Sequence, residues 1–140
     1  MDKSQFCKCL YYSTNALSRN LNKIAEEEFS VTGLAPTYGF ILMTVNKNPG
    51  IPAGEIANIM QLDPSTVTRL VDKLDSGKYV KRTREGKFVF VYPTSKSIKL
   101  NNKIIASWKS LYKRYTDLIG IEKSRKLTGK VYEAVLSMNK

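Results

Sequence analysis

The chain has 140 residues and a mass of 15.8 kDa, which is the size of one domain rather than of two large independent modules. Its 42% hydrophobic and 25% charged residues are close to globular averages, so it can bury a core and is neither collagen-like nor broadly disordered. Its 23 Lys and Arg against 12 Asp and Glu leave a net charge of +11, which predicts a polyanionic partner. Nucleic acid is the first candidate, and an anionic membrane surface is the second.

Several kinds of chemistry lack their usual residues. The chain has no histidine, which removes the commonest general base and the commonest metal ligand. Its two cysteines, Cys7 and Cys9, cannot build a disulfide framework, and this fits a reducing compartment. The first residues lack the apolar run of a signal peptide, and no apolar stretch approaches the roughly 18 residues of a membrane span. We therefore expect a cytoplasmic protein that is not an enzyme and has no metal, cofactor or membrane partner.

The chain begins with helical patterns. A long first helix is predicted from about residue 3 to about residue 29, followed or ended by Thr32-Gly33. Its apolar residues recur at helical spacing, and they are Leu10, Leu17, Leu21, Ile24 and Ala25, with Phe6 before them. Pro36 suits the first turn of a second helix, which should run to about Lys47 before Asn48-Pro49-Gly50 stops it.

A third, short helix is predicted to begin near Pro52, and the boundary of a fourth helix is the clearest in the sequence. Asp63 can cap the backbone N–H groups of that helix, Pro64 fits its first position, and Gly77 is a natural stop. Its apolar stripe comprises Val67, Leu70, Val71 and Leu74. At about 100° per residue the opposite side carries Ser65, Arg69, Asp72 and Ser76, flanked by Thr68 and Lys73.

A β-hairpin and two more helices complete the predicted order. Residues 79–84 and 88–92 are rich in β-branched and aromatic side chains, with Glu85-Gly86-Lys87 between them and Pro93 at the end. Thr94 or Ser95 can cap a long helix, and a break near Gly120 leads to a last helix. These terminal helices carry more apolar residues than so small a domain needs, which predicts an oligomer interface.

The order of helix, tight turn, helix and basic hairpin is that of a winged helix-turn-helix, so the predicted fold class is mainly α with a small β-hairpin wing. In this layout the recognition helix enters the major groove, while the hairpin follows the backbone or the minor groove. Hydroxyl, Arg and Lys side chains are suited to phosphates and base edges. The candidate DNA-binding residues are Ser65, Thr66, Thr68, Arg69, Lys73, Arg82, Arg84 and Lys87. The hydroxyl residues have an alternative role, because small hydroxyl side chains are also common in the first turn of a helix.

The sequence resembles the MarR family of bacterial transcriptional regulators through residues 50–57, 62–74 and 77–82. The resemblance implies long dimerisation helices at residues 1–32 and 94–140 around a DNA-binding part at residues 33–93. It also implies a homodimer that binds a pseudo-palindromic operator in double-stranded DNA, most often as a repressor released by a small ligand or a thiol oxidant. The family's wing usually carries Asp-x-Arg at its tip, whereas this chain has Glu85-Gly86-Lys87 and a shorter hairpin, so we expect a shallower reach into the minor groove.

Two sharper hypotheses compete with simpler interpretations. Cys7 and Cys9 could sense oxidants, but residues two apart on a helix point about 200° away from each other, and ordinary free thiols are the simpler interpretation. A small aromatic effector could bind among aromatic residues that otherwise belong to the core or an interface. These residues are Tyr11, Tyr12, Tyr38, Phe40, Tyr112 and Tyr115.

The main alternative function is a winged-helix module that binds an acidic protein and reads no DNA sequence. Arg69 and Lys73 favour DNA, because a protein-binding surface would more often expose an apolar or aromatic anchor there. Binding to a membrane surface is less favoured, since the apolar faces of the helices are needed for the core and the dimer.

Overall fold

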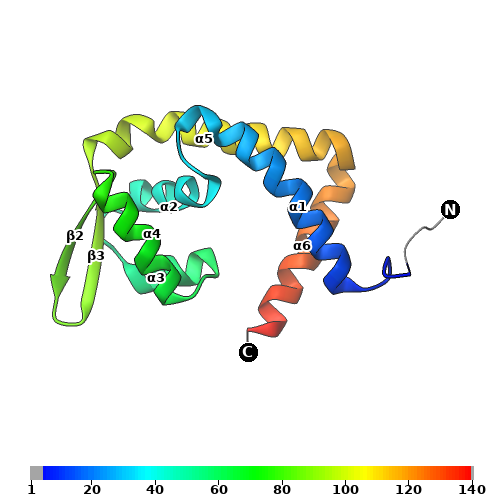
Figure 1. Cartoon of the computed structure of the whole chain (residues 1–140), viewed down its shortest axis with the longest axis horizontal. Coiled ribbons are helices and arrows are strands. Elements are labelled where there is room, and N and C mark those ends of the chain that lie inside the picture. Colours follow the sequence, from blue (N-terminus) through cyan, green and yellow to red (C-terminus); the bar gives the residue numbers. More distant parts are fainter. Residues whose placement is uncertain (1–4, 140) are drawn as a thin grey trace. The chain divides into compact units, whose positions relative to one another are not determined.

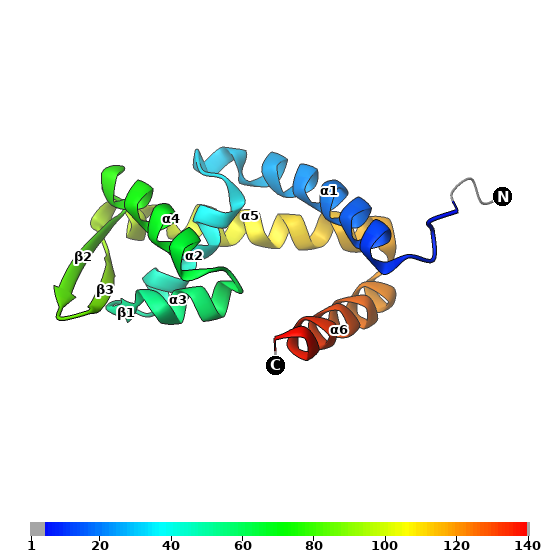
Figure 2. The same ribbon diagram turned by 60° about the horizontal axis from the view of Figure 1, so that its bottom comes forward.

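A computed structural model describes residues 5–139 of the chain and shows a mainly helical protein with one small sheet, which confirms the predicted fold class. Figures 1 and 2 show the elements in two views. In chain order they are α1 (Leu10–Phe29), the 3-10 turn η1 (Ser30–Thr32), α2 (Pro36–Lys47), β1 (Ile51–Pro52), α3 (Ala53–Met60), α4 (Pro64–Ser76), β2 (Val80–Glu85), β3 (Phe88–Pro93), α5 (Ser95–Ile119) and α6 (Ile121–Met138).

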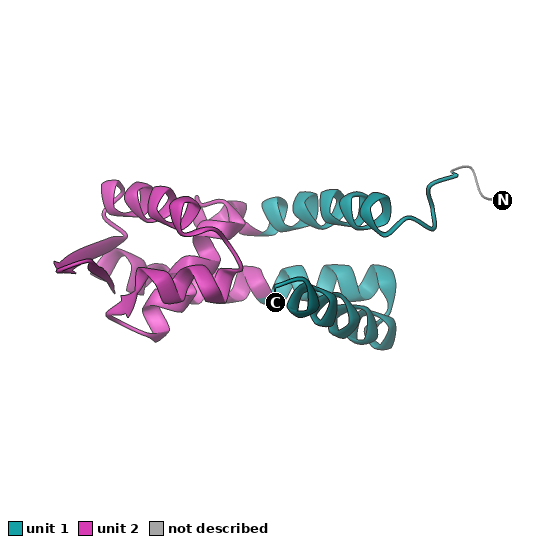
Figure 3. Ribbon diagram, turned by 90° about the horizontal axis from the view of Figure 1, so that it is seen from below, with its two compact units in different colours: residues 1–28, 109–140 teal, residues 29–108 magenta. Residues whose placement is uncertain are grey.

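These elements form two compact units, coloured separately in Figure 3. The winged-helix unit is residues 29–108, and the helical unit consists of the chain up to Glu28 together with the chain from Lys109 onward. The finer division into dimerisation helices and a DNA-binding part stays a prediction.

The winged-helix unit has its core between α2, α3, α4, the sheet and the first half of α5. Its fully buried side chains include Ile41, Leu42, Val45, Ile56, Leu74, Val91 and Ile104. The helix α2 begins at Pro36 and ends at Lys47, as predicted, and it lies close to Phe29 at Gly39. A Cβ atom at Gly39 would come within 2.6 Å of the Phe29 ring, so this helix needs a glycine at that position.

The sheet has three antiparallel strands in the order β1-β3-β2 rather than the two that were predicted. The additional strand is Ile51–Pro52, which pairs with Val91 and Phe90 of β3. Two residues are too few to show the alternation of a strand, and their partners lie about 40 positions further along the chain, so no local pattern indicates this pairing.

The hairpin loop is also tighter than predicted. Glu85 belongs to β2 and pairs with Phe88, which leaves Gly86 and Lys87 as the loop. Gly86 has a φ of 60°, the left-handed conformation that two-residue hairpin loops require and that glycine adopts without strain. The expected three-residue connection at positions 85–87 is therefore wrong by one residue.

The start of α1 differs from its prediction, whereas its end at Phe29 agrees. The helix begins at Leu10 instead of about residue 3, and residues 5–8 form a turn in which the Cys9 N–H donates to the Phe6 carbonyl at 2.8 Å. The Phe6 ring lies 5.7 Å from the Tyr12 ring, so Phe6 packs back on the helix instead of extending it. Cys7 and Cys9 thus precede the helix, and the expectation that helical spacing separates them does not hold.

The ends of two further helices carry small corrections. Asp63 occupies the capping position of α4, but among the described residues its side chain caps none of the helix's backbone N–H groups. Thr94 rather than Ser95 precedes α5, and its Oγ1 accepts a hydrogen bond from the Ser97 N–H at 3.4 Å. The same hydroxyl donates to the Lys78 carbonyl at 2.7 Å and links the start of α5 to the turn that follows α4.

The helical unit contains most of α1, the second half of α5, and α6. Gly120 has a φ of 102° and separates the last two helices, as the sequence predicts. Arg114 of α5 donates to Glu27 at 3.0 Å and to Glu28 at 2.9 Å. These hydrogen bonds raise the pKa of Arg114, because their effect is larger than that of desolvation, which lowers it. This ion pair links α1 to α5 inside the unit.

Candidate nucleic-acid interface

The helix α4 separates apolar from polar residues cleanly. Its buried stripe holds Val67, Val71 and Leu74, each no more than 2% exposed, while Leu70 is half-buried. Because this stripe packs against α3 and β2, the opposite side of the helix is exposed to solvent. That side exposes Ser65, Thr68, Arg69, Asp72, Lys73 and Ser76, with Thr66 half-buried. The structure therefore brings together the five α4 residues that were predicted to bind DNA.

Three of these side chains also interact within the helix. The Arg69 guanidinium donates to Thr66 Oγ1 at 3.4 Å, which directs Arg69 along the helix toward its amino end. Thr68 Oγ1 donates to the Pro64 carbonyl at 3.0 Å. Each hydroxyl oxygen keeps lone pairs that can still accept a hydrogen bond, so support of the helix and contact with a ligand are compatible.

The wing places the two arginines of β2 on one face of the sheet. Arg82 lies opposite Val91 and Arg84 lies opposite Val89, so both arginine side chains share the face that carries the fully buried Val91. Arg84 is exposed and nearer to the tip. Lys87 is exposed in the loop, with its Nζ 5.6 Å from the centre of the Phe88 ring.

Arg82 differs from the other predicted DNA-binding residues, because α4 holds it with two carboxylates. Its Nε donates to Asp75 Oδ2 at 2.9 Å, and its Nη1 donates to Asp72 Oδ1. The side chain is 31% exposed. Desolvation lowers the pKa of Arg82, but the hydrogen bonds and charges of Asp72 and Asp75 outweigh it, so its pKa is raised.

Lys96 was not singled out in the sequence and secures the base of the wing. Its Nζ donates to the Gly77 carbonyl at 2.8 Å and lies 4.2 Å from the centre of the Tyr79 ring. A lysine at the first turn of a long helix resembles any solvated charge, so no sequence signal could have found this contact.

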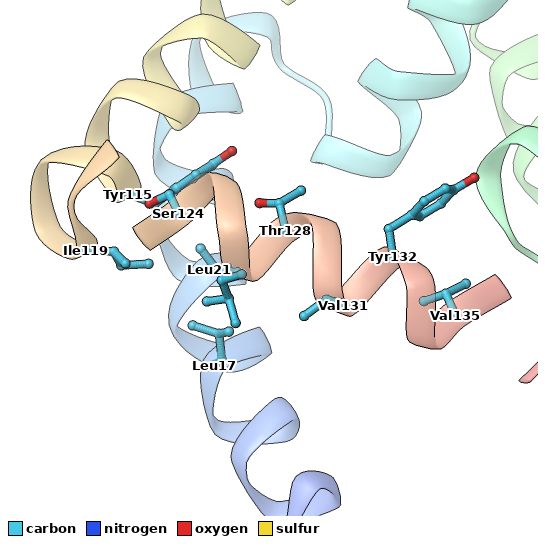
Figure 4. Close-up of a pocket in the computed structure, with 10 residues that line it drawn as sticks. Leu17, Leu21, Tyr115, Ile119, Ser124, Thr128, Val131, Tyr132 and Val135 are labelled. Atoms are coloured by element: carbon cyan, nitrogen blue, oxygen red, sulfur yellow. The ribbon is translucent and has the colours of Figure 1, made fainter. Parts of the chain in front are cut away.

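The helical unit carries an apolar pocket of about 310 Å³, shown in Figure 4. Its lining includes Leu17 and Leu21 of α1 and Leu127, Val131 and Val135 of α6, all of them in the terminal helices that were predicted to form an oligomer interface. Leu10, at the start of α1, is 68% exposed. Ser124 also lines the pocket, and its buried hydroxyl has no hydrogen-bond partner among the described residues.

The remaining predicted site residues are dispersed. Cys7 and Cys9 are both exposed ahead of α1. Of the aromatic effector candidates, Tyr38 and Phe40 belong to the winged-helix unit, where Phe40 packs edge-on against Phe29. The others belong to the helical unit, and they are Tyr11, Tyr12, Tyr112 and Tyr115. Burial raises the pKa of Tyr115, whose ring lies 5.5 Å from that of Tyr112.

Residues 5–139 lack two kinds of feature. No group of three or more His, Cys, Asp or Glu side chains in this range could hold a metal ion. No helix in the described chain is both long and apolar enough to cross a membrane.

Comparison with known proteins agrees with this geometry. A model of the MarR family matches residues 32–87. The chain is similar to MdtR of Bacillus subtilis, an HTH-type transcriptional repressor, with 28% identity over 83 residues that cover 59% of this chain and 54% of that relative. The match therefore spans about half of the relative's length.

Solved structures resemble the chain over nearly its full length. The DNA complex of MepR from S. aureus superposes with a TM-score of 0.79 at 16% identity, covering 92% of this chain and 97% of that chain. CouR from Rhodococcus jostii bound to p-coumaroyl-CoA superposes with a TM-score of 0.75 at 20% identity, covering 96% and 95%. At these identities the likeness is one of fold. Residues 32–87 thus match the MarR family of transcriptional regulators, and the solved structures show the same winged-helix fold over nearly the whole chain.

Proposed function

We propose that the chain is a sequence-specific DNA-binding transcriptional regulator of the cytoplasm, a repressor that binds a pseudo-palindromic operator as a homodimer. The observation that carries this proposal is the exposed polar face of α4 beside a basic hairpin within one compact unit. The MarR family, whose model matches residues 32–87, is one of transcriptional regulators rather than of enzymes, and the similar protein MdtR is a transcriptional repressor.

The chemistry of the exposed face suits the two grooves of DNA. Arg69 presents a planar fork of donors that matches the O6 and N7 atoms of guanine. Lys73, Arg84 and Lys87 are exposed cations suited to phosphates, and Ser65 is an exposed hydroxyl with little side-chain entropy to lose. In this proposal α4 reads the major groove and the hairpin follows the neighbouring backbone.

The homodimer is supported by apolar surface on the helical unit. Leu127 and Val131 of α6, which line the apolar pocket together with Leu17 and Leu21 of α1, remain 38% and 40% exposed. A monomer that leaves so much clustered apolar surface in water would be prone to association. A second copy that covers this face would form an interface that resembles a divided core.

Release by a small ligand is the finer part of the proposal. The structural relative CouR binds p-coumaroyl-CoA, whose coumaroyl group is aromatic, and the chain carries exposed aromatic side chains such as Tyr11 and Tyr112. We propose an aromatic effector on this basis. Oxidant sensing by Cys7 or Cys9 is a second route, supported by the exposure of both residues.

The alternative of a protein-binding module is less favoured by the exposed side of α4. That side presents Arg69, Lys73 and hydroxyl groups, while its large apolar residues face the core. A protein-binding face would present an apolar or aromatic anchor among these polar groups.

The experiment that tests the function is footprinting on the DNA upstream of the gene and of its neighbours, followed by titration of the protected fragment at several salt concentrations. We expect protection of a defined site, an affinity that falls steeply with salt, and weak binding to a scrambled fragment. Equal binding to the protected and scrambled fragments would contradict sequence-specific regulation. Absence of binding at low salt would contradict DNA binding altogether.

A further inference from the structure

An ion-paired cluster joins the recognition helix to the wing inside the winged-helix unit. Asp72 and Asp75 are three residues apart on α4, so they project from neighbouring positions on the same side of the helix. Arg82 of β2 bonds to both carboxylates with two different nitrogens. A planar guanidinium held at two points has a defined direction, which a lysine ammonium cannot reproduce.

The place of Arg82 in the sheet lets this contact direct the whole hairpin. Arg82 pairs with Val91, which is fully buried and pairs on its other side with Ile51 of β1. The short strand β1 supports β3 only at Phe90 and Val91. Between there and the tip, residues 84–89 form a two-stranded ribbon, an arrangement that is marginally stable by itself in water.

The charge of the cluster argues against a phosphate contact by Arg82. Two carboxylates and one guanidinium give the cluster a net charge of −1, so it does not attract a phosphate as the isolated Arg84 does. In a protein of net charge +11 that binds a polyanion, two carboxylates beside the interface weaken binding by electrostatics alone. We therefore expect Asp72 and Asp75 to position other groups of the interface and not to contribute to binding by their charge.

We propose that Asp72, Asp75 and Arg82 form a clamp that sets the direction of the hairpin relative to α4, so that Arg84 and Lys87 meet the backbone while α4 lies in the major groove. Arg82 is then a positioning residue and not a DNA contact. The proposal rests on the DNA-binding function proposed above.

The first test uses the sign of a charge change. Asp72→Asn and Asp75→Asn are isosteric and each raise the net charge by one, which on electrostatics alone strengthens binding to DNA. The clamp predicts the opposite, a loss of about tenfold in affinity for the protected fragment with each variant. A gain in affinity with both variants would overturn the proposal.

The second test separates positioning from phosphate contact, with Arg84 as the matched control on the same strand and the same face. Arg84→Gln should reduce the slope of log affinity against log salt by about one unit, whereas Arg82→Gln should lower affinity and leave the slope unchanged. Arg82→Lys should behave like Arg82→Gln, because lysine cannot bridge both carboxylates. Arg82→Gln combined with Asp75→Asn should cost little more than either change alone. A reduced slope with Arg82→Gln, or normal affinity with Arg82→Lys, would contradict the clamp.

A third measurement needs no DNA and so separates failure of the clamp from failure of the proposed function. Amide hydrogen exchange of residues 84–89 in the free protein should be faster in Asp75→Asn than in the parent chain, while exchange in α2 stays the same. Unchanged exchange in the ribbon would overturn the clamp. Faster exchange in a protein that binds no DNA would retain the clamp as a structural contact and reject its role in recognition.

Discussion

At the end of α4 the chain turns at two neighbouring residues, Gly77 and Lys78. Gly77 has a right-handed φ of −79°, and a Cβ atom there would lie 3.0 Å from the Tyr79 ring, which would have to shift by a few tenths of an ångström. Lys78 takes the left-handed conformation with a φ of 64°. Glycine is the residue that adopts that conformation without strain, and here the strain falls on a lysine.

This strain predicts that Lys78→Gly stabilises the fold. Removing the Cβ atom from a left-handed residue relieves steric strain of about 1–2 kcal/mol. The greater conformational freedom of glycine in the unfolded chain offsets about half of this gain in stability. We expect the free energy of unfolding, measured by urea denaturation, to rise by up to about 1 kcal/mol. Lys78→Ala keeps the Cβ atom and serves as the control, so an equal gain from alanine would show that conformational strain is not the cause.

Arg69 carries the prediction about specificity. If its exposed guanidinium donates to a guanine, Arg69→Ala should cost about 1–3 kcal/mol on the preferred site and relax the preference at one position in each half-site. Arg69→Lys should recover charge but not the two-point contact. Affinities for a set of single-base variants of the site measure this, and an equal loss on every variant would identify Arg69 as a phosphate contact instead.

At the scale of elements, the position of α2 depends on its close contact with the Phe29 ring. Gly39 of α2 faces the ring of Phe29, which is fully buried and packs edge-on against Phe40 at 5.7 Å. A methyl group at Gly39 would force the ring or the helix to move, because the ring has no free space around it.

We therefore expect Gly39→Ala to destabilise the protein by about 1–3 kcal/mol despite the better helix propensity of alanine. Gly54 in α3 is the matched control, since nothing lies within 4 Å of the position that its Cβ atom would occupy. Gly54→Ala should stabilise the protein by up to about 1 kcal/mol. Urea denaturation of the two variants tests the sign, and destabilisation by both would place the cause in the backbone rather than in the Phe29 contact.

The elements also show which parts of the fold a sequence can predict. The helices α2 and α4 follow from proline at their first positions and from apolar spacing, because these signals lie within the elements themselves. The strand β1 does not, since its two residues become a strand only by pairing with Val91 and Phe90. The exposed face of α4 follows from its periodicity, whereas the ion pairs of Arg82 depend on the tertiary position of the hairpin and leave no local pattern.

At the scale of the whole molecule, charge and apolar surface are the properties that the proposed function uses. Residues 64–90 hold seven Lys and Arg against three Asp and Glu, whereas residues 1–63 hold five against six. Residues 91–140 hold a further eleven against three, so the basic charge covers α4, the hairpin and the last two helices. The helical unit adds an apolar surface, where Leu127 and Val131 of α6 remain partly exposed. A chain with these two properties is suited to bind DNA through its basic hairpin and α4 and a second copy through its apolar surface.

Truncation before α6 tests whether this helix is needed for assembly and, through assembly, for DNA binding. Ending the chain at Gly120 removes Leu127, Val131 and Val135 from the apolar pocket, and we expect dimerisation and tight binding to the site to be lost together. The far-ultraviolet circular dichroism of the rest should persist in proportion to its helices. A truncated chain that still protects the full site would show that α6 is not needed for assembly.

The most direct test of the proposed operator-binding homodimer is sedimentation of the intact protein at micromolar concentration, alone and with the footprinted DNA fragment. One recognition helix reads only a few base pairs, whereas a two-fold dimer reads two half-sites about one helical turn apart. We predict twice the 15.8 kDa chain mass for the free protein and two chains for each DNA fragment. A monomer in both experiments, bound to a single half-site, would contradict the account.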